Sequence, residues 1–244
     1  MSERSVQPIY LLADSQLLFW KGSAGPFLAS VCQASEIAAP SVAYIGASNG
    51  DSPEAYSILI AALDQIQVRS KRHITAALSA EDREFLEQAD IVVLAGGDVE
   101  AGWNVFTRTG LRQVIESRYR EGAVLIGVSA GAIQLGTHAA LAGESGNSGD
   151  SRLIETFGLV RLILDVHDEQ RDWQTLSSTI HLLEGSARGV GVPSGAGLIA
   201  HPDGTLEPIR RGLEEFTFSD GKLRRAVLLP DLVSSAEPAP VAAE

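Results

Sequence analysis

The 244-residue sequence contains one cysteine, Cys32. A single cysteine cannot form an internal disulfide, which excludes the small secreted proteins that depend on several disulfides and favours a reducing, cytoplasmic environment. Basic residues are also scarce, because 19 Lys and Arg stand against 31 Asp and Glu and give a net charge of −12. Binding to phosphate backbones needs clustered Lys and Arg, so nucleic acid is not an expected partner.

Long apolar runs are missing as well. Residues 1–8 are polar and lead into a short apolar run at residues 9–13, without the basic and apolar segments of a signal peptide. No run approaches the roughly 20 apolar residues that span a bilayer. A Walker A sequence, a glycine-rich dinucleotide turn after the first strand and a His/Cys cluster with metal spacing are also missing. We therefore expect a cytoplasmic protein that uses no membrane, metal or cofactor.

Short apolar segments alternate along the chain with segments of helical periodicity. Strands are predicted at residues 9–13, 41–46, 72–76, 91–95 and 123–128, and helices at residues 52–66, 79–88, 111–119 and from 130 onward. Nearly continuous apolar strands are typical of a parallel sheet that is covered by helices on both faces. The sequence therefore predicts an α/β fold of three layers with a mostly parallel sheet.

The second half of the sequence is less regular. It predicts a strand at residues 159–166, a helix at 173–183 and two hairpins, at 197–209 and 216–229. The C-terminal part should thus be rich in β-hairpins. Residues 233–244 lack hydrophobic periodicity, and we expect one domain over residues 1–232 followed by a disordered tail.

The most informative segment is Gly127-Val128-Ser129-Ala130-Gly131, a Gly-x-Ser-x-Gly motif between a predicted buried strand and a predicted helix. A serine on such a sharp turn has a strained backbone and an exposed hydroxyl group, and the N–H of Ala130 points into the same space. Ser129 is therefore the candidate nucleophile, with Ala130 as an oxyanion donor. The alternative is a tight strand-to-helix turn with an ordinary serine.

A second glycine turn, Gly96-Gly97-Asp98, ends the preceding predicted strand. If the two strands are neighbours, this turn lies beside Ser129 at the carboxyl edge of the sheet, where open α/β folds bind ligands. Gly97 is then the candidate for a second oxyanion donor, with a turn needed only for packing as the alternative.

A nucleophilic serine needs a general base, and the sequence offers five histidines: His73, His138, His167, His181 and His201. We expect His138 to be carried away from Ser129 on the helix that begins at residue 130, and His73 to lie at the surface. His167 follows the apolar run 162–166 and precedes a polar stretch, and a histidine just past a strand end can reach the edge of the sheet. His167 is therefore the candidate base, with a structural or exposed histidine as the alternative.

The order of these motifs resembles that of the dipeptidase E and cyanophycinase family of serine peptidases, whose fold is similar to that of the class I glutamine amidotransferases. The resemblance extends from about residue 43 to residue 192 and is most specific over 96–136. It implies a nucleophile at Ser129, a base at His167 and an oxyanion hole from Gly97 and Ala130. It also implies an amidotransferase- or flavodoxin-like fold, small acidic peptides as substrates, aspartyl or isoaspartyl peptides among them, and association as a homodimer.

This sequence departs from the family pattern at the acid that orients the histidine. Cyanophycinase-like members carry a glutamate where Ser194 stands here, whereas the acid of dipeptidase E follows the nucleophile, where Glu144 is the nearest match. Loss of this acid reduces the rate by orders of magnitude. Glu144 is the candidate third catalytic residue, and the sequence leaves Asp150, Glu155 and Asp165 open as alternatives.

The substrate-binding residues also differ. Cyanophycinases carry regularly spaced arginines after the histidine, and here only Arg171 remains, with Trp173 in place of a second one. Arg171 is a candidate for binding a substrate carboxylate, although an ion pair with Asp168 or Asp172 is the alternative. Asp98, beside the oxyanion turn, is a second candidate contact. The sequence thus predicts a serine hydrolase of small peptides, with an inactive binding homologue or a hydrolase of another acyl donor as alternatives.

Overall fold

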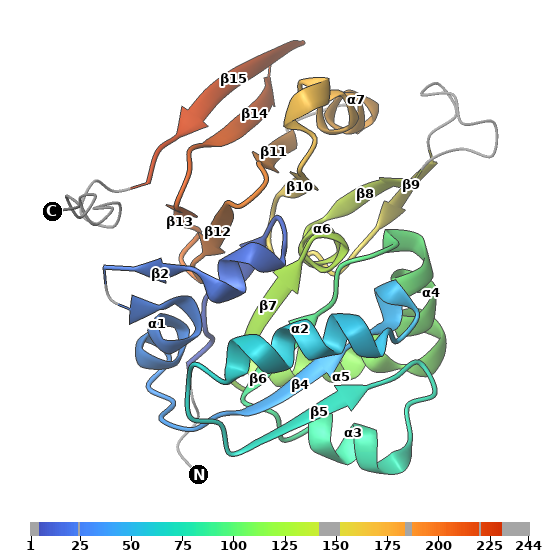
Figure 1. Ribbon diagram of the computed structural model, residues 1–244. Coiled ribbons are helices and arrows are strands. Elements are labelled where there is room, and N and C mark those ends of the chain that lie inside the picture. Colours follow the sequence, from blue (N-terminus) through green and yellow to red (C-terminus); the bar gives the residue numbers. More distant parts are fainter. Residues whose placement is uncertain (1–4, 24, 142–151, 184–186, 220, 231–244) are drawn as a thin grey trace, which may run out of the picture.

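The computed structural model describes residues 5–23, 25–141, 152–183, 187–219 and 221–230 (Figure 1). Its main sheet has seven strands in the order β13 (Leu206–Ile209), β12 (Gly197–Ala200), β1 (Ile9–Leu12), β7 (Val124–Val128), β6 (Ile91–Leu94), β4 (Ser41–Ile45) and β5 (Ser70–Ile74). The strands β1, β7, β6, β4 and β5 are parallel, and β12 and β13 add an antiparallel edge. The predicted mostly parallel sheet is confirmed.

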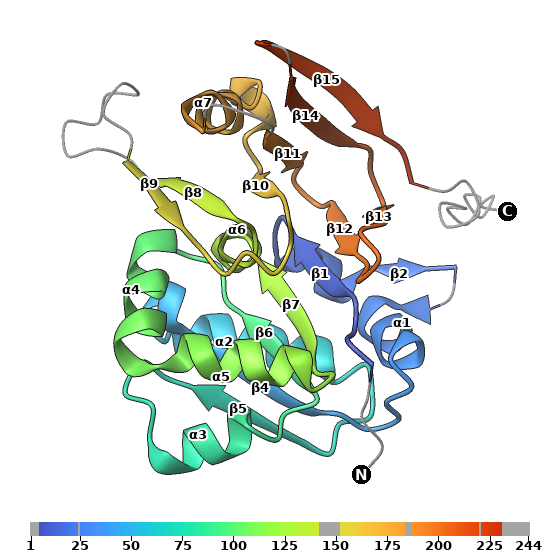
Figure 2. The ribbon, with the colours of Figure 1, turned by 180° about the vertical axis from the view of Figure 1, so that it is seen from behind.

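Helices cover both faces of this sheet (Figures 1 and 2). One face packs against α1 (Phe27–Ala34), α2 (Pro53–Leu63) and the 3-10 turn η1 (Ser15–Phe19). The other face packs against α3 (Ala80–Leu86), α4 (Val99–Thr109), α5 (Leu111–Arg120) and α6 (Ala130–Leu135). Alternate side chains of the strands enter the two cores, so that Val93 lies in the first core and Val92 in the second. This alternation explains why the strands are apolar throughout.

Two helices begin at the caps that the sequence indicates. Ser52 accepts the N–H of Ala55 at 3.1 Å and is followed by Pro53 at the first position of α2. Ser79 forms a capping box with Asp82 at the start of α3. Each cap satisfies N–H groups that the helix itself leaves without partners.

A smaller four-stranded sheet follows, formed by β10 (Ile163–Val166), β11 (Ala187–Val192), β14 (Leu213–Ser219) and β15 (Lys222–Leu228) in this order. The helix α7 (Gln174–Leu182) packs on it through a core that includes Trp173 and Phe216. The remaining pairs are β2 (Lys21–Gly22) with β3 (Gly25–Pro26) and β8 (His138–Leu141) with β9 (Arg152–Glu155). Both predicted C-terminal hairpins are present, as β12–β13 and β14–β15.

Several boundaries differ from the prediction. The helix that starts at Ala130 ends at Leu135, and His138 begins β8, so the expectation that His138 lies on this helix was wrong. The strand predicted from residue 159 begins only at Ile163, and α1 was not predicted. The predicted tail at residues 233–244 lies outside the described residues, and its disorder and the division into one domain stay predictions. Within the described ranges, no helix has the length and apolarity needed to cross a membrane.

Candidate active site

Ser129 lies on a sharp turn between β7 and α6, and its backbone has φ 50° and ψ −112°. A non-glycine residue with such a positive φ is strained, and the strain persists only where the surrounding structure enforces it. Here the N–H of Ser129 donates to the carbonyl of Leu12 at 2.8 Å. On the helical side, a Cβ atom at Gly131 would lie 2.3 Å from the carbonyl oxygen of Leu94. Only glycine therefore lets α6 approach β6 this closely, as the motif requires.

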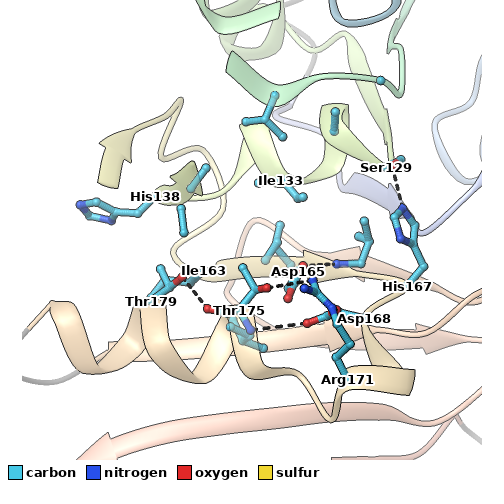
Figure 3. A pocket seen from close by; sticks show the side chains of 18 residues that line it. Ser129, Ile133, His138, Ile163, Asp165, His167, Asp168, Arg171, Thr175 and Thr179 are labelled. Atoms are coloured by element: carbon cyan, nitrogen blue, oxygen red, sulfur yellow. Dashed lines mark hydrogen bonds and ion pairs between the residues drawn. The ribbon is translucent and has the colours of Figure 1, made fainter. Parts of the chain in front are cut away.

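His167 follows the last residue of β10 and faces Ser129 (Figure 3). Its Nε2 atom lies 3.0 Å from Oγ of Ser129, and the backbone N–H of His167 donates to the carbonyl of Val192 at 3.0 Å. His167 is exposed, and its backbone has φ 45°. With this backbone turn after β10, the ring faces the nucleophile turn. A neutral imidazole that accepts a proton at Nε2 must carry its own proton at Nδ1. Among the described residues, His167 makes no side-chain hydrogen bond other than the one at Nε2.

The glycine turn 96–98 lies beside the nucleophile, because a Cβ atom at Gly96 would lie 3.2 Å from Cβ of Ser129. Gly97 has φ 132°, and a Cβ atom there would lie 2.1 Å from the carbonyl oxygen of Ser48. The next residue, Asp98, donates its N–H to this same oxygen at 2.7 Å. Gly97 and Ala130 both line one pocket with Ser129 and His167. The structure thus brings together the four residues that the sequence singles out for nucleophile, base and oxyanion hole.

A buried polar network supports the glycine turn, and sequence reasoning missed it. The side chain of Gln134 is fully buried and donates from Nε2 to the carbonyl of Val99 at 2.9 Å and to Oγ of Ser48 at 3.1 Å. It therefore links the nucleophile helix α6 to the start of α4 and to the 3-10 turn η2 (Ala47–Asn49). The available signal was that Gln134 is the single polar side chain in the apolar helix 130–135.

The pocket has a volume of about 340 Å³. Ser129 and His167 lie at one end and His138 at the other, with Ile133, Asp165, Arg171, Thr175 and Thr179 between them (Figure 3). A cavity of this size can hold a small ligand or a peptide of only a few residues.

Arg171 lines this pocket but already has protein partners. Its Nε atom lies 2.6 Å from Oδ1 of Asp168, and its Nη2 atom donates to Oγ1 of Thr175 at 3.2 Å. The Arg171 side chain is 68% exposed whereas that of Asp168 is 6% exposed, so the guanidinium remains accessible. Trp173, in the place of a second arginine, is buried in the core of the smaller sheet. The ion pair of Arg171 with Asp168 is present, and the binding of a substrate carboxylate by Arg171 stays a prediction.

The remaining sequence candidates occupy different places. Asp98 accepts the N–H of Ala101 at 2.7 Å as the N-cap of α4, and it is not among the residues that line the pocket. Glu144 and Asp150 lie outside the described residues. Glu155 ends β9 and is exposed. The N–H of Ser194, at the position of the missing acid, donates to Oε1 of Glu169 at 3.1 Å.

Asp165 is a carboxyl group in the wall of the pocket. Its Oδ1 atom accepts the N–H of Val166 at 3.0 Å, and its Oδ2 atom is buried and has no hydrogen-bond partner among the described residues. Burial, followed by the negative charge of Asp168, raises the pKa of Asp165 to about 7. Burial has this effect because the charged form loses hydration.

The raised pKa predicts that Asp165→Asn stabilises the protein at alkaline pH. The unfolded chain releases this proton near pH 4 and the folded chain only near pH 7, so the free energy of unfolding falls as the pH rises between these values. At pH 8 the variant should be more stable by up to about 4 kcal/mol, and at pH 4 nearly unchanged.

Urea unfolding between pH 4 and pH 9 measures this difference. Asp172→Asn is the matched control, because Asp172 is an exposed partner of Arg225 and such pairs contribute at most about 1 kcal/mol. Parallel stability curves for wild type and Asp165→Asn would contradict the prediction.

No group of three or more His, Cys, Asp or Glu residues suited to a metal occurs within the part of the chain that the structure describes. The expectation that the protein needs no metal or cofactor stays a prediction.

Comparison with known proteins finds relatives of this chain and of its fold. The profile described as Peptidase family S51 matches residues 33–206. The chain is 26% identical to the cyanophycinase of Trichormus variabilis and 25% identical to that of Nostoc sp., in each case over 154 residues that cover 61% of this chain and 52% of the relative. It thus aligns with about half the length of these curated relatives. A crystal structure of a peptidase from an acI-B1 Actinobacterium has a similar fold, with a TM-score of 0.65, 18% identity and coverage of 94% of this chain and 96% of that one.

Proposed function

Because the chain belongs to peptidase family S51, we propose that it is a serine-dependent hydrolase of small peptides that works through an acyl-enzyme at Ser129. The observation that carries the proposal is the 3.0 Å contact between Oγ of Ser129 and Nε2 of His167, beside the glycine turn at Gly97. A nucleophile within hydrogen-bond reach of its base, next to backbone N–H groups, is the arrangement that acyl transfer needs.

In the first half of the proposed reaction, Oγ of Ser129 attacks the carbonyl carbon of the scissile bond while Nε2 of His167 takes the hydroxyl proton. The N–H groups of Gly97 and Ala130 donate to the oxygen that becomes negative, a contribution of about 3–4 kcal/mol for one such donor in other enzymes. The tetrahedral intermediate then expels the amine, which receives its proton from His167.

In the second half, His167 removes a proton from a water molecule that attacks the ester carbonyl of the acyl-enzyme. The same N–H groups stabilise the second tetrahedral intermediate. Its collapse returns the proton to Oγ of Ser129 and releases the carboxylic acid.

For the substrate, we propose short peptides with an aspartyl or isoaspartyl residue. The accessible guanidinium of Arg171 supports this class, because a substrate carboxylate can exchange with that of Asp168 or share the guanidinium with it. Asp98, at the start of α4 next to the oxyanion turn, is proposed as a second contact, toward the amino group of the peptide. The volume of about 340 Å³ favours dipeptides over long chains. A homodimer stays part of the proposal without an assigned surface.

A second candidate function is a catalytically inactive homologue that binds a small ligand or a partner protein. It is favoured by one observation, since Nδ1 of His167 has no hydrogen-bond partner among the described residues. The family resemblance also places the acid at the position of Ser194. Without an acid, the imidazole is poorly oriented and its cation is not stabilised.

Labelling with a fluorophosphonate separates the two candidates. We expect one adduct per chain, located at Ser129 by peptide mapping, and no adduct when the protein is denatured before the reagent is added, because only an activated serine reacts quickly. A panel of aspartyl, isoaspartyl and uncharged dipeptides with the same C-terminal residue then tests the substrate class. No adduct in the native protein would favour the inactive homologue, and an adduct without turnover of the panel would favour another acyl donor.

A further inference from the structure

The two proposed oxyanion donors come from different elements of the fold. The N–H of Ala130 belongs to the first residue of α6, and the N–H of Gly97 belongs to the turn between β6 and α4. Among the described residues, neither N–H has a hydrogen-bond partner. An oxyanion is stabilised by both donors only if each of them lies about 2.7–3.1 Å from its position. The distance between α6 and the glycine turn must therefore be held within narrow limits.

Gln134 is the side chain that connects these two elements. It lies one helical turn after Ala130 in α6 and is fully buried. Its Nε2 atom donates to the carbonyl of Val99, just after the glycine turn, at 2.9 Å. The same atom donates to Oγ of Ser48 at 3.1 Å, and Oγ of Ser48 lies 3.3 Å from Oε1 of Gln134. The amide thus binds both a residue that follows the glycine turn and a residue that contacts this turn.

Ser48 extends this connection to Gly97. The carbonyl oxygen of Ser48 accepts the N–H of Asp98 at 2.7 Å, and a Cβ atom at Gly97 would lie 2.1 Å from that oxygen. The glycine turn therefore packs directly on the backbone of Ser48, whose side chain is held by Gln134. A displacement of Gln134 would reach the N–H of Gly97 through these hydrogen bonds and this close backbone contact.

Gly102 gives this contact the space that it needs. It is buried in the interior of α4, where glycine is less favourable for the helix than alanine. A Cβ atom at Gly102 would lie 2.1 Å from Oγ of Ser48 and 2.6 Å from Nε2 of Gln134. A larger residue would displace both side chains, so α4 can approach η2 and α6 this closely only with glycine at position 102.

Stability alone does not explain a polar contact at this place. Replacing both partners of a buried hydrogen bond by apolar groups of the same shape can be nearly neutral for the free energy of unfolding. Hydrogen bonds differ from apolar packing because they fix a direction as well as a distance, and a fully satisfied buried network rigidifies the elements that it joins. This property is needed where two backbone donors must point to the same atom.

We propose that Gln134 and Ser48 are positioning residues that hold the N–H of Gly97 at the distance from Ala130 that a two-donor oxyanion hole needs. This inference rests on the proposed hydrolase function. Neither side chain is among the residues that line the pocket, so neither contacts the substrate. Their effect on the reaction passes through the backbone of the glycine turn and should therefore appear in kcat and not in KM.

The test compares Gln134→Met and Ser48→Ala with the matched control Ser41→Ala. Ser41 begins β4 and Ser48 lies just past its other end, and both are buried. Oγ of Ser41 donates to Oδ2 of Asp90 at 2.9 Å, so the control also loses a buried hydrogen bond. All three variants should unfold at a lower urea concentration than the wild type.

Only the two variants at the glycine turn should lose activity. On the aspartyl dipeptide that the wild type hydrolyses fastest, Gln134→Met should reduce kcat by about 10- to 100-fold and Ser48→Ala by about 10-fold, with KM changed by less than about 3-fold. Ser41→Ala should keep kcat within about 2-fold. The rate of fluorophosphonate labelling of Ser129 should fall by similar factors, because the phosphoryl oxygen occupies the position of the oxyanion.

A double-mutant cycle with Gly97→Ala decides whether the effect passes through the glycine turn. In a protein that already carries Gly97→Ala, adding Gln134→Met should reduce the labelling rate by less than about 3-fold, because the donor that Gln134 positions is already displaced. If Gln134→Met reduces the rate by the same factor in both backgrounds, Gln134 does not act through Gly97 and the proposal is overturned.

The backbone amide NMR signal of Gly97 provides a readout that needs no substrate. It should shift in Gln134→Met and in Ser48→Ala and stay unchanged in Ser41→Ala. An unchanged Gly97 signal or an unchanged kcat in folded Gln134→Met overturns the proposal, and Ser48→Ala decides it in the same way if Gln134→Met does not fold. If wild-type Ser129 is not labelled by the fluorophosphonate, the hydrolase function fails, while the NMR comparison still decides whether Gln134 positions the N–H of Gly97.

Discussion

Replacing Ser129 by alanine is expected to reduce kcat/KM by about 10⁴- to 10⁶-fold and to abolish fluorophosphonate labelling, with the fold retained. The reason is that Oγ is the atom that bonds to the substrate in the proposed reaction, and no other hydroxyl group lines the pocket within hydrogen-bond distance of Nε2 of His167 among the described residues. The remaining activity comes from binding and from the N–H groups of Gly97 and Ala130.

The strained backbone at position 129 predicts that glycine there stabilises the protein relative to alanine. Ser129 is held at φ 50° and ψ −112°, a conformation that costs an L-residue about 1–3 kcal/mol and glycine much less. Ser129→Gly should therefore unfold at a higher urea concentration than Ser129→Ala, by about 1 kcal/mol in the free energy of unfolding, although neither variant is active.

Ser57 is the matched control for this comparison. It is exposed in the middle of α2, where glycine is less stable than alanine by about 1 kcal/mol. The order of the glycine and alanine variants should thus reverse between positions 57 and 129. If Ser129→Ala retains substantial turnover, the nucleophile is elsewhere, and if both positions prefer alanine, the turn at Ser129 is not strained.

The sequence could predict the main sheet and the nucleophile turn because both depend on local patterns. Strands such as residues 124–128 are apolar throughout, and this follows from burial on both faces. The glycines around Ser129 are required because a Cβ atom at Gly127 or Gly131 would lie only 2.6 or 2.3 Å from a backbone carbonyl oxygen, so the spacing of the motif carries the geometry. His167 was accessible to the same reasoning, since it directly follows a strand, although that strand, β10, belongs to the smaller sheet.

Other elements could not be predicted, because they lack a local signal or depend on contacts between residues distant in sequence. The helix α1 has eight residues and no side-chain cap at its N-terminus, so it lacks a start signal. The helix α6 ends after six residues, and His138, which was predicted to lie on it, begins β8 instead. The pairing of Glu169 with Ser194 joins positions 25 residues apart through a turn whose shape only the folded chain defines. The raised pKa of Asp165 likewise depends on burial, which a single sequence does not give.

Gly97→Ala should reduce kcat by about 10²- to 10³-fold and also destabilise the protein. A Cβ atom at Gly97 would lie 2.1 Å from the carbonyl oxygen of Ser48, and the residue has φ 132°, which L-residues rarely adopt. The turn must therefore move away from Ser48, which weakens the 2.7 Å hydrogen bond from the N–H of Asp98 to that oxygen. In the proposed reaction, this movement takes the N–H of Gly97 away from the substrate oxyanion.

Gly204→Ala separates the strain from the displacement. Gly204 has φ 89° in the hairpin between β12 and β13, and a Cβ atom there would meet no atom within 4 Å. It should lose about 1–2 kcal/mol of stability through backbone strain alone and keep its full kcat. Gly97→Ala should lose more stability than Gly204→Ala in urea unfolding. Its decrease in kcat should persist at urea concentrations well below its unfolding midpoint, because in the proposed reaction the displaced N–H affects the transition state and not the amount of folded protein. A folded Gly97→Ala variant with unchanged kcat would remove Gly97 from the oxyanion hole and leave Ala130 as the remaining proposed donor.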